Sequence, residues 1–349
     1  MSDPATTAAR YLASKQAVAA ALSSREIAEH IPRALRDASF FSARTIYAGH
    51  LAETQAEMRE LAGFMGAADV DAAVAAVRAD HPSADDLLTG YRRAVFGARD
   101  FVLSHDLVTL VEGAELEVAP TPACLRGVLP FAAYDPPGPF AARQLGYYYV
   151  TPPPPGADGT LAAHPSASMP TTGVHEAFPG HHVQITRANR APTLARRLAG
   201  AYDGGSLLVE GWAFYCEEMM ERQGFLAAPE VRLMRLNDQV WRACRVVIDA
   251  EVATGRMVFD EAVALLVREA RMAPQLADLE VRWYVESPGQ PMSYLLGKRE
   301  VTSMARSFAR TRTTSLKTFH DALLEWGCVS PRLIAWGLGL GARPAAFAG

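Results

Sequence analysis

The segment TTGVHEAFPGHHVQ, residues 171–184, holds three of the nine histidines of the chain and one glutamate. Imidazole and carboxylate groups are the ligands that zinc takes in proteins where thiolates are absent. Glu176 directly follows the first histidine, as in the HExxH motif, whose glutamate takes a proton from water activated by the metal. The apolar residues around the histidines favour burial over the alternative, a surface loop with clustered histidines. The segment therefore predicts a metal site.

The segment departs from HExxH because Pro179 occupies the fifth position of the motif. Proline and glycine are poor residues for a helix interior, so Pro179-Gly180 predicts a kinked or widened turn. In a straight helix, His182 would share the face of His175 but lie ~10.5 Å along the axis, at ~1.5 Å per residue. Ligand nitrogens must each lie ~2.0–2.1 Å from one zinc. A distorted turn favours His181 as the second ligand, with His182 as the alternative ligand or a group that faces the substrate.

The composition is typical of a globular protein, because 50% of the 349 residues are hydrophobic and 21% are charged. Apolar residues at helical spacing predict helices over residues 5–110, and again over residues 171–340, which contain the metal site. Between these parts, ELEVAP (115–120) and LGYYYVT (145–151) have strand character.

We expect one catalytic domain over residues 1–349, with a mainly α fold and a small antiparallel β-sheet in residues 111–151. The run PPPPGADGT, residues 152–160, predicts an exposed loop, because consecutive prolines cannot join a helix interior or a central strand. The long periodic segments after this loop predict helices at residues 206–223, 229–256, 259–272, 274–286, 291–309 and 315–327.

The formal net charge of -4 gives no basic field, so we expect neither a nucleic-acid nor a membrane partner. The N-terminal residues lack a basic stretch followed by an apolar run, which predicts no signal peptide. No stretch reaches the ~18 apolar residues that a membrane-spanning helix needs. The four cysteines lie far apart and form no CxxC pair, which predicts reduced thiols in a cytoplasmic protein; they are Cys124, Cys216, Cys244 and Cys328.

The segment LLVEGWAFYCEEM, residues 207–219, contains the next candidate ligand. Glu210 opens a helix that is otherwise apolar on one face, and a carboxylate there is costly unless it is paired or bound to a metal. The segment resembles the NEGFA-type segment of aminopeptidase N-like zinc peptidases, which implies that Glu210 is the third zinc ligand. Glu217 lies two turns further on the same face, either as a solvated acid or in contact with a ligand.

Three charged residues form a stripe in WRACRVVIDAEVATGR, residues 241–256. Arg242, Arg245 and Asp249 fall at positions i, i+3 and i+7 of the predicted helix. One interpretation is a structural ion-pair network between helices. The other is functional: an arginine binds a substrate carboxylate or stabilises the transition state, while Asp249 orients a ligand histidine.

Two tyrosines flank the turn at residues 288–291. Tyr284 precedes this turn, and Tyr294 shares a helical face with Lys298 after it. A tyrosine near a catalytic zinc commonly donates to the oxyanion, whereas a core tyrosine with a satisfied hydroxyl is the alternative. We predict catalytic roles for Glu176, Arg245 and Tyr294. The residues predicted to contact a ligand or the substrate are His182, Asp249, Glu217, Tyr284, Arg242 and Lys298.

Four segments in this order resemble the bacterial domain-of-unknown-function family 885, which is similar to the gluzincin metallopeptidases. They are HEAFPGHHVQ, EGWAFYCEE, RACRVVIDA and VRWYVESPGQPMSYLLG. The resemblance implies a gluzincin-like architecture, with zinc held by His175, a histidine of the GHH segment and Glu210. It also implies that Glu176 is the general base. The residues that it places along the cleft are Arg245, Asp249, Tyr284 and Tyr294.

Two departures from the family leave alternative functions open. The N-terminal helical region is short, and Ala253 stands where members of the family carry a histidine. Our leading prediction is a zinc-dependent hydrolase that cleaves a small peptide or an amide-containing small molecule. The alternatives are a zinc enzyme of the same fold that acts on a small metabolite in specialised biosynthesis, and a non-catalytic binding protein.

Overall fold

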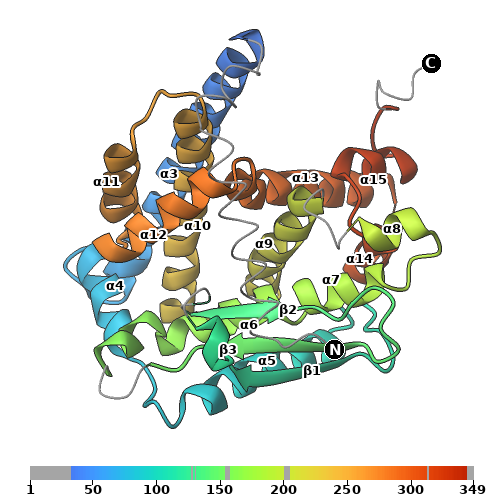
Figure 1. Cartoon of the computed structure of the whole chain (residues 1–349), viewed down its shortest axis with the longest axis horizontal. Coiled ribbons are helices and arrows are strands. Elements are labelled where there is room, and N and C mark those ends of the chain that lie inside the picture. Colours follow the sequence, from blue (N-terminus) through green and yellow to red (C-terminus); the bar gives the residue numbers. More distant parts are fainter. Residues whose placement is uncertain are drawn as a thin grey trace. The chain divides into compact units, whose positions relative to one another are not determined.

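The computed structural model of the protein describes residues 33–126, 129, 131–153, 158–199, 205–312 and 314–343 (Figure 1). The helices expected over residues 5–32 and the part of the proline-rich loop at residues 154–157 lie outside the described residues.

The chain divides into two compact units. The first takes Met1–Ala75, Ala123–Gly127 and Leu233–Leu295, and the second takes Ala76–Pro122, Val128–Arg232 and Leu296–Gly349. Each unit is thus assembled from segments that are distant in the sequence. The expectation of one catalytic domain over the whole chain stays a prediction.

The second unit contains the sheet, which has the strand order β1-β3-β2. β1 (Glu115–Pro120) and β3 (Leu145–Val150) lie in the two segments for which the sequence predicted strand character. β1 pairs parallel to β3, whereas β2 (Ala132–Asp135) pairs antiparallel to β3. The sheet is therefore mixed, and the prediction of an antiparallel sheet was wrong. Alternation specifies which face is buried, but the long connection between β1 and β3 allows either direction.

Helices cover the sheet within this unit. The buried side chains of β1 and β3, Val118, Tyr148 and Val150, belong to one apolar core with residues of α5 and α6. Figure 1 shows α5, α6 and α7 beside the strands. The bounds are α5 Leu87–Ser104, α6 Met169–Glu176, α7 His181–Ala188, α8 Leu194–Leu198, α9 Ser206–Arg222, α14 Leu316–Leu324 and α15 Pro331–Gly337.

The first unit is helical in its described part. Its elements are α3 Arg33–Phe64, α11 Phe259–Ala270 and α12 Pro274–Glu286, together with parts of α4 Val70–Ala79, α10 Pro229–Ala253 and α13 Gln290–Thr311. α10 and α13 each contribute residues to both units. The observed bounds of α9 to α14 follow the predicted periodic segments closely, and the mainly α fold is confirmed.

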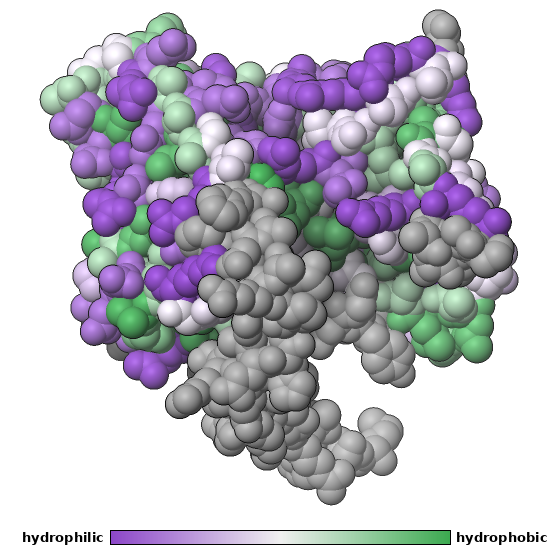
Figure 2. Space-filling view, turned by 90° about the horizontal axis from the view of Figure 1, so that it is seen from above, coloured by the Kyte–Doolittle hydropathy of each residue, from purple (hydrophilic) through white to green (hydrophobic). Residues whose placement is uncertain are grey.

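Large apolar side chains that reach the surface are spread over many elements. The face drawn in Figure 2 shows small hydrophobic patches among hydrophilic residues. Scattered apolar residues of this kind are normal on a protein surface. Within the described ranges, none of the helices has the length and apolar character needed to cross a membrane.

Candidate metal centre

The turn between α6 and α7 brings two histidines together. α6 ends at Glu176 and α7 begins at His181, so the helix breaks at the Pro179-Gly180 pair, as predicted. The backbone N–H of Gly180 donates to the carbonyl oxygen of Val174 at 3.0 Å. A Cβ atom on Gly180 would overlap the carbonyl oxygens of Val174 and His175, so the turn closes this tightly only around glycine. The ring centroids of His175 and His181 consequently lie 4.8 Å apart.

The third member of the group comes from α9. Glu210 lies in the first turns of this helix, next to Gly211. A Cβ atom on Gly211 would overlap the backbone of Gly297, and one on Gly297 would overlap the carbonyl oxygen of Leu207. Two glycines thus allow α9 and α13 to approach closely beside Glu210, which helps to fix the position of this carboxylate.

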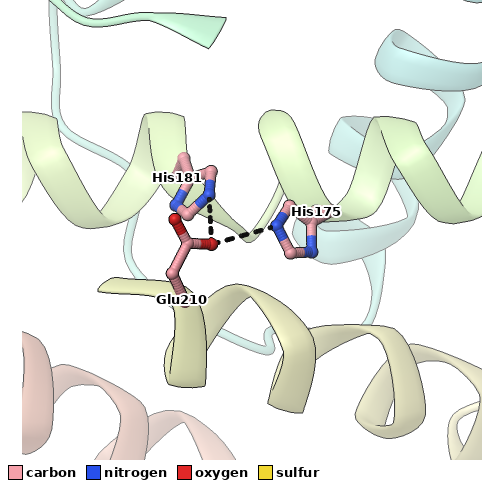
Figure 3. A group of neighbouring side chains, drawn as sticks. All are labelled: His175, His181 and Glu210. Atoms are coloured by element: carbon pink, nitrogen blue, oxygen red, sulfur yellow. Dashed lines mark ion pairs between the residues drawn. The ribbon is translucent and has the colours of Figure 1, made fainter. Parts of the chain in front are cut away.

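The three side chains converge on one point (Figure 3). The Oε2 atom of Glu210 lies 3.5 Å from Nε2 of His175 and 3.5 Å from Nε2 of His181. All three ligand atoms lie within 4.8 Å of one another. Glu210 Oε2 is buried and has no hydrogen-bond partner among the described residues, because both contacts are too long for good hydrogen bonds.

This geometry fits a bound divalent cation. Ligand atoms placed tetrahedrally at ~2.0–2.2 Å from zinc lie about 3.3–3.6 Å apart, close to the observed spacing around Glu210 Oε2. A buried carboxylate oxygen without a hydrogen bond is costly, and a cation at this point would compensate that cost. Two imidazoles and one carboxylate form a donor set that zinc commonly takes.

A second carboxylate orients His175. Glu217 Oε1 lies 2.7 Å from Nδ1 of His175, and the Glu217 side chain is 2% exposed. Such a contact fixes the orientation of a ligand histidine. Glu217 thus contacts a candidate ligand, which is one of the two positions that the sequence analysis left open for it. The Asp249 carboxylate instead accepts hydrogen bonds from the backbone N–H groups of Gly289 and Met292, at the start of α13. Such N–H groups at a helix start have no partner within the helix and can donate to a nearby carboxylate. An orienting role for Asp249 at a ligand histidine stays a prediction.

The two carboxylates make this point electrostatically favourable for positive charge. Burial lowers the pKa of His175, but the nearby carboxylate of Glu210 and the hydrogen bond to Glu217 outweigh it and raise the pKa to about 10. Burial raises the pKa of Glu210, yet His175 and His181 hold it well below the ordinary range of a carboxyl group. The group thus holds a proton tightly, and a metal cation can take the place of that proton.

Glu176 ends α6 directly after His175, and its side chain is half-buried. Within the part of the chain that the structure describes, its carboxylate makes no hydrogen bond. Burial raises the pKa values of three tyrosine hydroxyls above the usual range, and negative charges that include Glu176 raise them further. These residues are Tyr91, Tyr134 and Tyr148. These hydroxyls therefore stay protonated at neutral pH.

His182 and its neighbour His181 contact different residues. Its Nδ1 atom lies 3.0 Å from the hydroxyl of Tyr134 in β2. Burial lowers its pKa to about 4. His182 also lines a cavity of about 340 Å³ together with Phe178, Val183 and Thr186. The structure thus brings His181, and not His182, to Glu210, while the ligand role of His181 stays a prediction.

The remaining predicted residues are packed in ion pairs and aromatic contacts. In the first unit, Arg245 donates to Glu280 at 3.0 Å and to the Tyr284 hydroxyl at 3.2 Å, and its guanidinium lies 4.5 Å from the ring centroid of Tyr294. Arg242 lies 3.6 Å from Asp238. These contacts match the structural interpretation. A catalytic role for Arg245 and Tyr294 stays a prediction.

Lys298 belongs to the second unit. Its Nζ atom lies 2.7 Å from Glu218 and 4.4 Å from the ring centroid of Phe214. Both partners lie in α9, so Lys298 ties α13 to the helix that carries Glu210. A contact of Lys298 with substrate stays a prediction.

Several residues at the site carried no signal in the sequence analysis. Tyr134 lies in β2, a strand of four residues that is too short to recognise in the sequence. Tyr148 lies at a buried position of β3, within the predicted strand segment LGYYYVT. Trp212 donates from its indole N–H to the carbonyl oxygen of Pro179 at 2.9 Å. Such a contact joins segments distant in sequence, and only the folded chain shows it.

Fold and site together define a mainly helical protein with a buried His-His-Glu group that could hold a metal ion. The chain belongs to the family described as "Bacterial protein of unknown function (DUF885)", which matches residues 45–336. This confirms the family resemblance. No curated protein matches the chain.

Two solved structures share the fold. A "putative lipoprotein of unknown function from Shewanella oneidensis" is 24% identical, with a TM-score of 0.74 over 85% of this chain and 56% of that chain. A "putative lipoprotein from Colwellia psychrerythraea" is 22% identical, with a TM-score of 0.75 over 86% of this chain and 52% of that chain. The chain spans about half the length of these structures.

The comparison corrects the expected location. Both similar structures are described as lipoproteins, and this finding overturns the expectation of a cytoplasmic protein. That expectation rested on cysteine spacing, which does not report the compartment. Cys216, Cys244 and Cys328 are buried, where a thiol packs as a small apolar side chain in any compartment.

Proposed function

We propose that the protein is a zinc-dependent hydrolase that cleaves a peptide bond or another amide bond. The observation that carries this proposal is the convergence of His175, His181 and Glu210 on one buried point, with Glu176 directly after the first histidine. The resemblance of the HEAFPGHH and EGWA segments to gluzincin motifs supports the same chemistry.

Zinc is the proposed metal because two imidazoles and one carboxylate are a common set of three protein ligands in catalytic zinc sites. When bound, zinc polarises a carbonyl group and lowers the pKa of water. Glu217 would hold the His175 ring through Nδ1, so that Nε2 keeps its lone pair toward the metal.

Glu176 is the proposed general base. Its carboxylate would accept a proton from the attacking water and deliver it to the leaving nitrogen of the cleaved amide. The position of Glu176 supports this role, because its half-buried side chain directly follows His175, one of the three residues that converge on the candidate metal point.

The test combines metal analysis with a cleavage screen. The purified protein is expected to retain about one zinc per chain after dialysis, and the zinc-loaded protein is expected to cleave members of a peptide and acyl-amide library. Glu176→Gln should keep the metal and lose roughly 100- to 10,000-fold in turnover, because the amide cannot accept the proton. Protein that binds no metal, or a Glu176→Gln variant as active as the parent, would contradict the proposal.

A further inference from the structure

We propose that Trp212 is a positioning residue of the metal centre, which sets His181 against Glu210 by holding the carbonyl group of Pro179. The inference rests on the metal site of the proposed function, but not on the reaction that the site catalyses.

The contact that suggests this role is a single buried hydrogen bond. The indole N–H of Trp212 donates to the Pro179 carbonyl oxygen at 2.9 Å, and the Trp212 side chain is fully buried. Within the described residues, no backbone N–H donates to this carbonyl. Pro179 lies in the break between α6 and α7, so its carbonyl has no partner within a helix. The indole is thus the group that satisfies it.

The position of this hydrogen bond in the chain lets it influence the spacing of the proposed metal ligands. The Pro179 carbonyl belongs to the peptide group that leads into Gly180, and His181 follows directly. Trp212 lies two residues after Glu210 in the same helix, α9. The hydrogen bond therefore connects the rigid element that carries one ligand to the peptide group from which another ligand starts.

Other contacts hold this turn at different points. The Gly180 N–H bonds back to α6, and the Gln184 side chain donates to the Leu208 carbonyl oxygen of α9 at 3.2 Å. The Gln184 bond fixes the body of α7 beside α9, but it acts after His181. Among the side-chain hydrogen bonds of the described residues, the Trp212 bond is the one that runs from α9 to the residues between the two histidines. Its loss should leave α7 docked and let the His181 ring depart from the ligand geometry.

A merely structural role is the competing explanation, because Trp212 also packs against Tyr215 and His320. Tyr215 provides the matched control. It lies in the same helix and aromatic cluster, and its hydroxyl makes one buried hydrogen bond, 3.0 Å from Nε2 of His320. Tyr215→Phe removes a comparable bond but leaves the turn between the histidines untouched.

The experiment compares the full-length parent with Trp212→Phe and Tyr215→Phe. Zinc affinity is measured by competition with a chelator, coordination geometry by the absorption spectrum of bound Co²⁺, and stability by thermal unfolding of the metal-free proteins. Trp212→Phe is expected to weaken zinc binding roughly 10- to 100-fold, the range for groups that position ligands, and to change the Co²⁺ spectrum. Tyr215→Phe should lower the melting temperature by a similar amount and leave both metal readouts at the parental values.

Equal effects of the two variants on zinc affinity, or a Trp212→Phe variant with parental affinity and spectrum, would overturn the inference. If Trp212→Phe does not fold, β-(3-benzothienyl)alanine at position 212 keeps the shape of the side chain without the N–H group and permits the same comparison. A parent protein that binds no zinc would overturn the proposed function together with this inference. A zinc-binding parent with an unaffected Trp212 variant would overturn the inference alone.

Discussion

The Nδ1 atom of His175 lies 2.7 Å from a carboxylate oxygen of Glu217, inside the fold and out of contact with solvent. Because a carboxylate only accepts hydrogen bonds, the proton of this pair resides on Nδ1 whenever the imidazole is neutral. The lone pair is then on Nε2, the nitrogen that lies 3.5 Å from Glu210 Oε2. One acidic residue thereby selects the tautomer that a metal ligand needs.

We predict that Glu217→Ala weakens zinc binding roughly 10- to 100-fold, as the loss of such an orienting partner usually does. Glu217→Gln keeps an acceptor oxygen at the same place and should weaken binding less. The measurement is zinc affinity by chelator competition. Glu218→Gln is the control, since Glu218 follows in the same helix but pairs with Lys298 and Arg222. A Glu217→Ala variant with parental zinc affinity would show that the contact does not support the ligand.

We predict that His181→Ala loses zinc and that His182→Ala retains it. His181 Nε2 lies 3.5 Å from Glu210 Oε2, whereas His182 is hydrogen-bonded to Tyr134. Removing one of three protein ligands should abolish tight binding, because structural and catalytic zinc sites depend on at least three. Zinc content after dialysis, measured beside the melting temperature of each variant, decides the assignment. The opposite pattern would assign the ligand role to His182.

Local patterns in the sequence predicted the elements well. β1 and the helices α9 to α14 follow from periodicity, because period 2 and period 3.6 depend only on neighbouring residues. The three members of the candidate metal group followed from residue chemistry: few environments accommodate the Glu210 carboxylate on an apolar helix.

Relationships between distant segments did not follow from the sequence. The parallel pairing of β1 with β3 depends on how the connection between them runs, which no local pattern records. The sequence analysis considered both Asp249 and Glu217 as partners of a ligand histidine. Only the folded chain shows that Glu217 contacts His175 and that Asp249 accepts backbone N–H groups at the start of α13. The contact of Tyr134 with His182 likewise joins distant segments, so only the folded chain shows it.

We predict that Arg245→Ala destabilises the protein by about 2–4 kcal/mol, because it removes a buried cation from its partners. The Arg245 side chain is 5% exposed, and the guanidinium lies near the rings of Trp241, Trp283 and Tyr294. Arg282→Ala is the control: Arg282 pairs with Asp278 at the surface, where solvent screens the ion pair, so its loss should change stability far less. Denaturant unfolding measures both. An Arg245→Ala variant of parental stability that has lost turnover would instead favour the substrate-binding role.

The last prediction concerns the dependence of stability on pH. Burial lowers the pKa of His320 from 6.5 to about 4. Its Nδ1 atom lies 2.7 Å from the Leu107 carbonyl oxygen and its Nε2 atom 3.0 Å from the Tyr215 hydroxyl, an arrangement that suits the neutral ring. At pH values between the folded-state pKa of about 4 and the ordinary pKa of 6.5, the His320 ring binds a proton in the unfolded chain but not in the folded protein. The free energy of unfolding must therefore fall as the pH drops through this window.

The His320→Gln variant isolates this contribution, because His182 and His164, whose pKa values burial also lowers, remain in both proteins. Between about pH 7 and about pH 4.5, the parent should lose about 2–3 kcal/mol more of its unfolding free energy than the variant does, at ~1.36 kcal/mol per pKa unit. Denaturant titrations of the metal-free proteins at the two pH values measure the difference. Equal losses in parent and variant would mean that the folded protein protonates His320 as readily as the unfolded chain does, and would contradict the prediction.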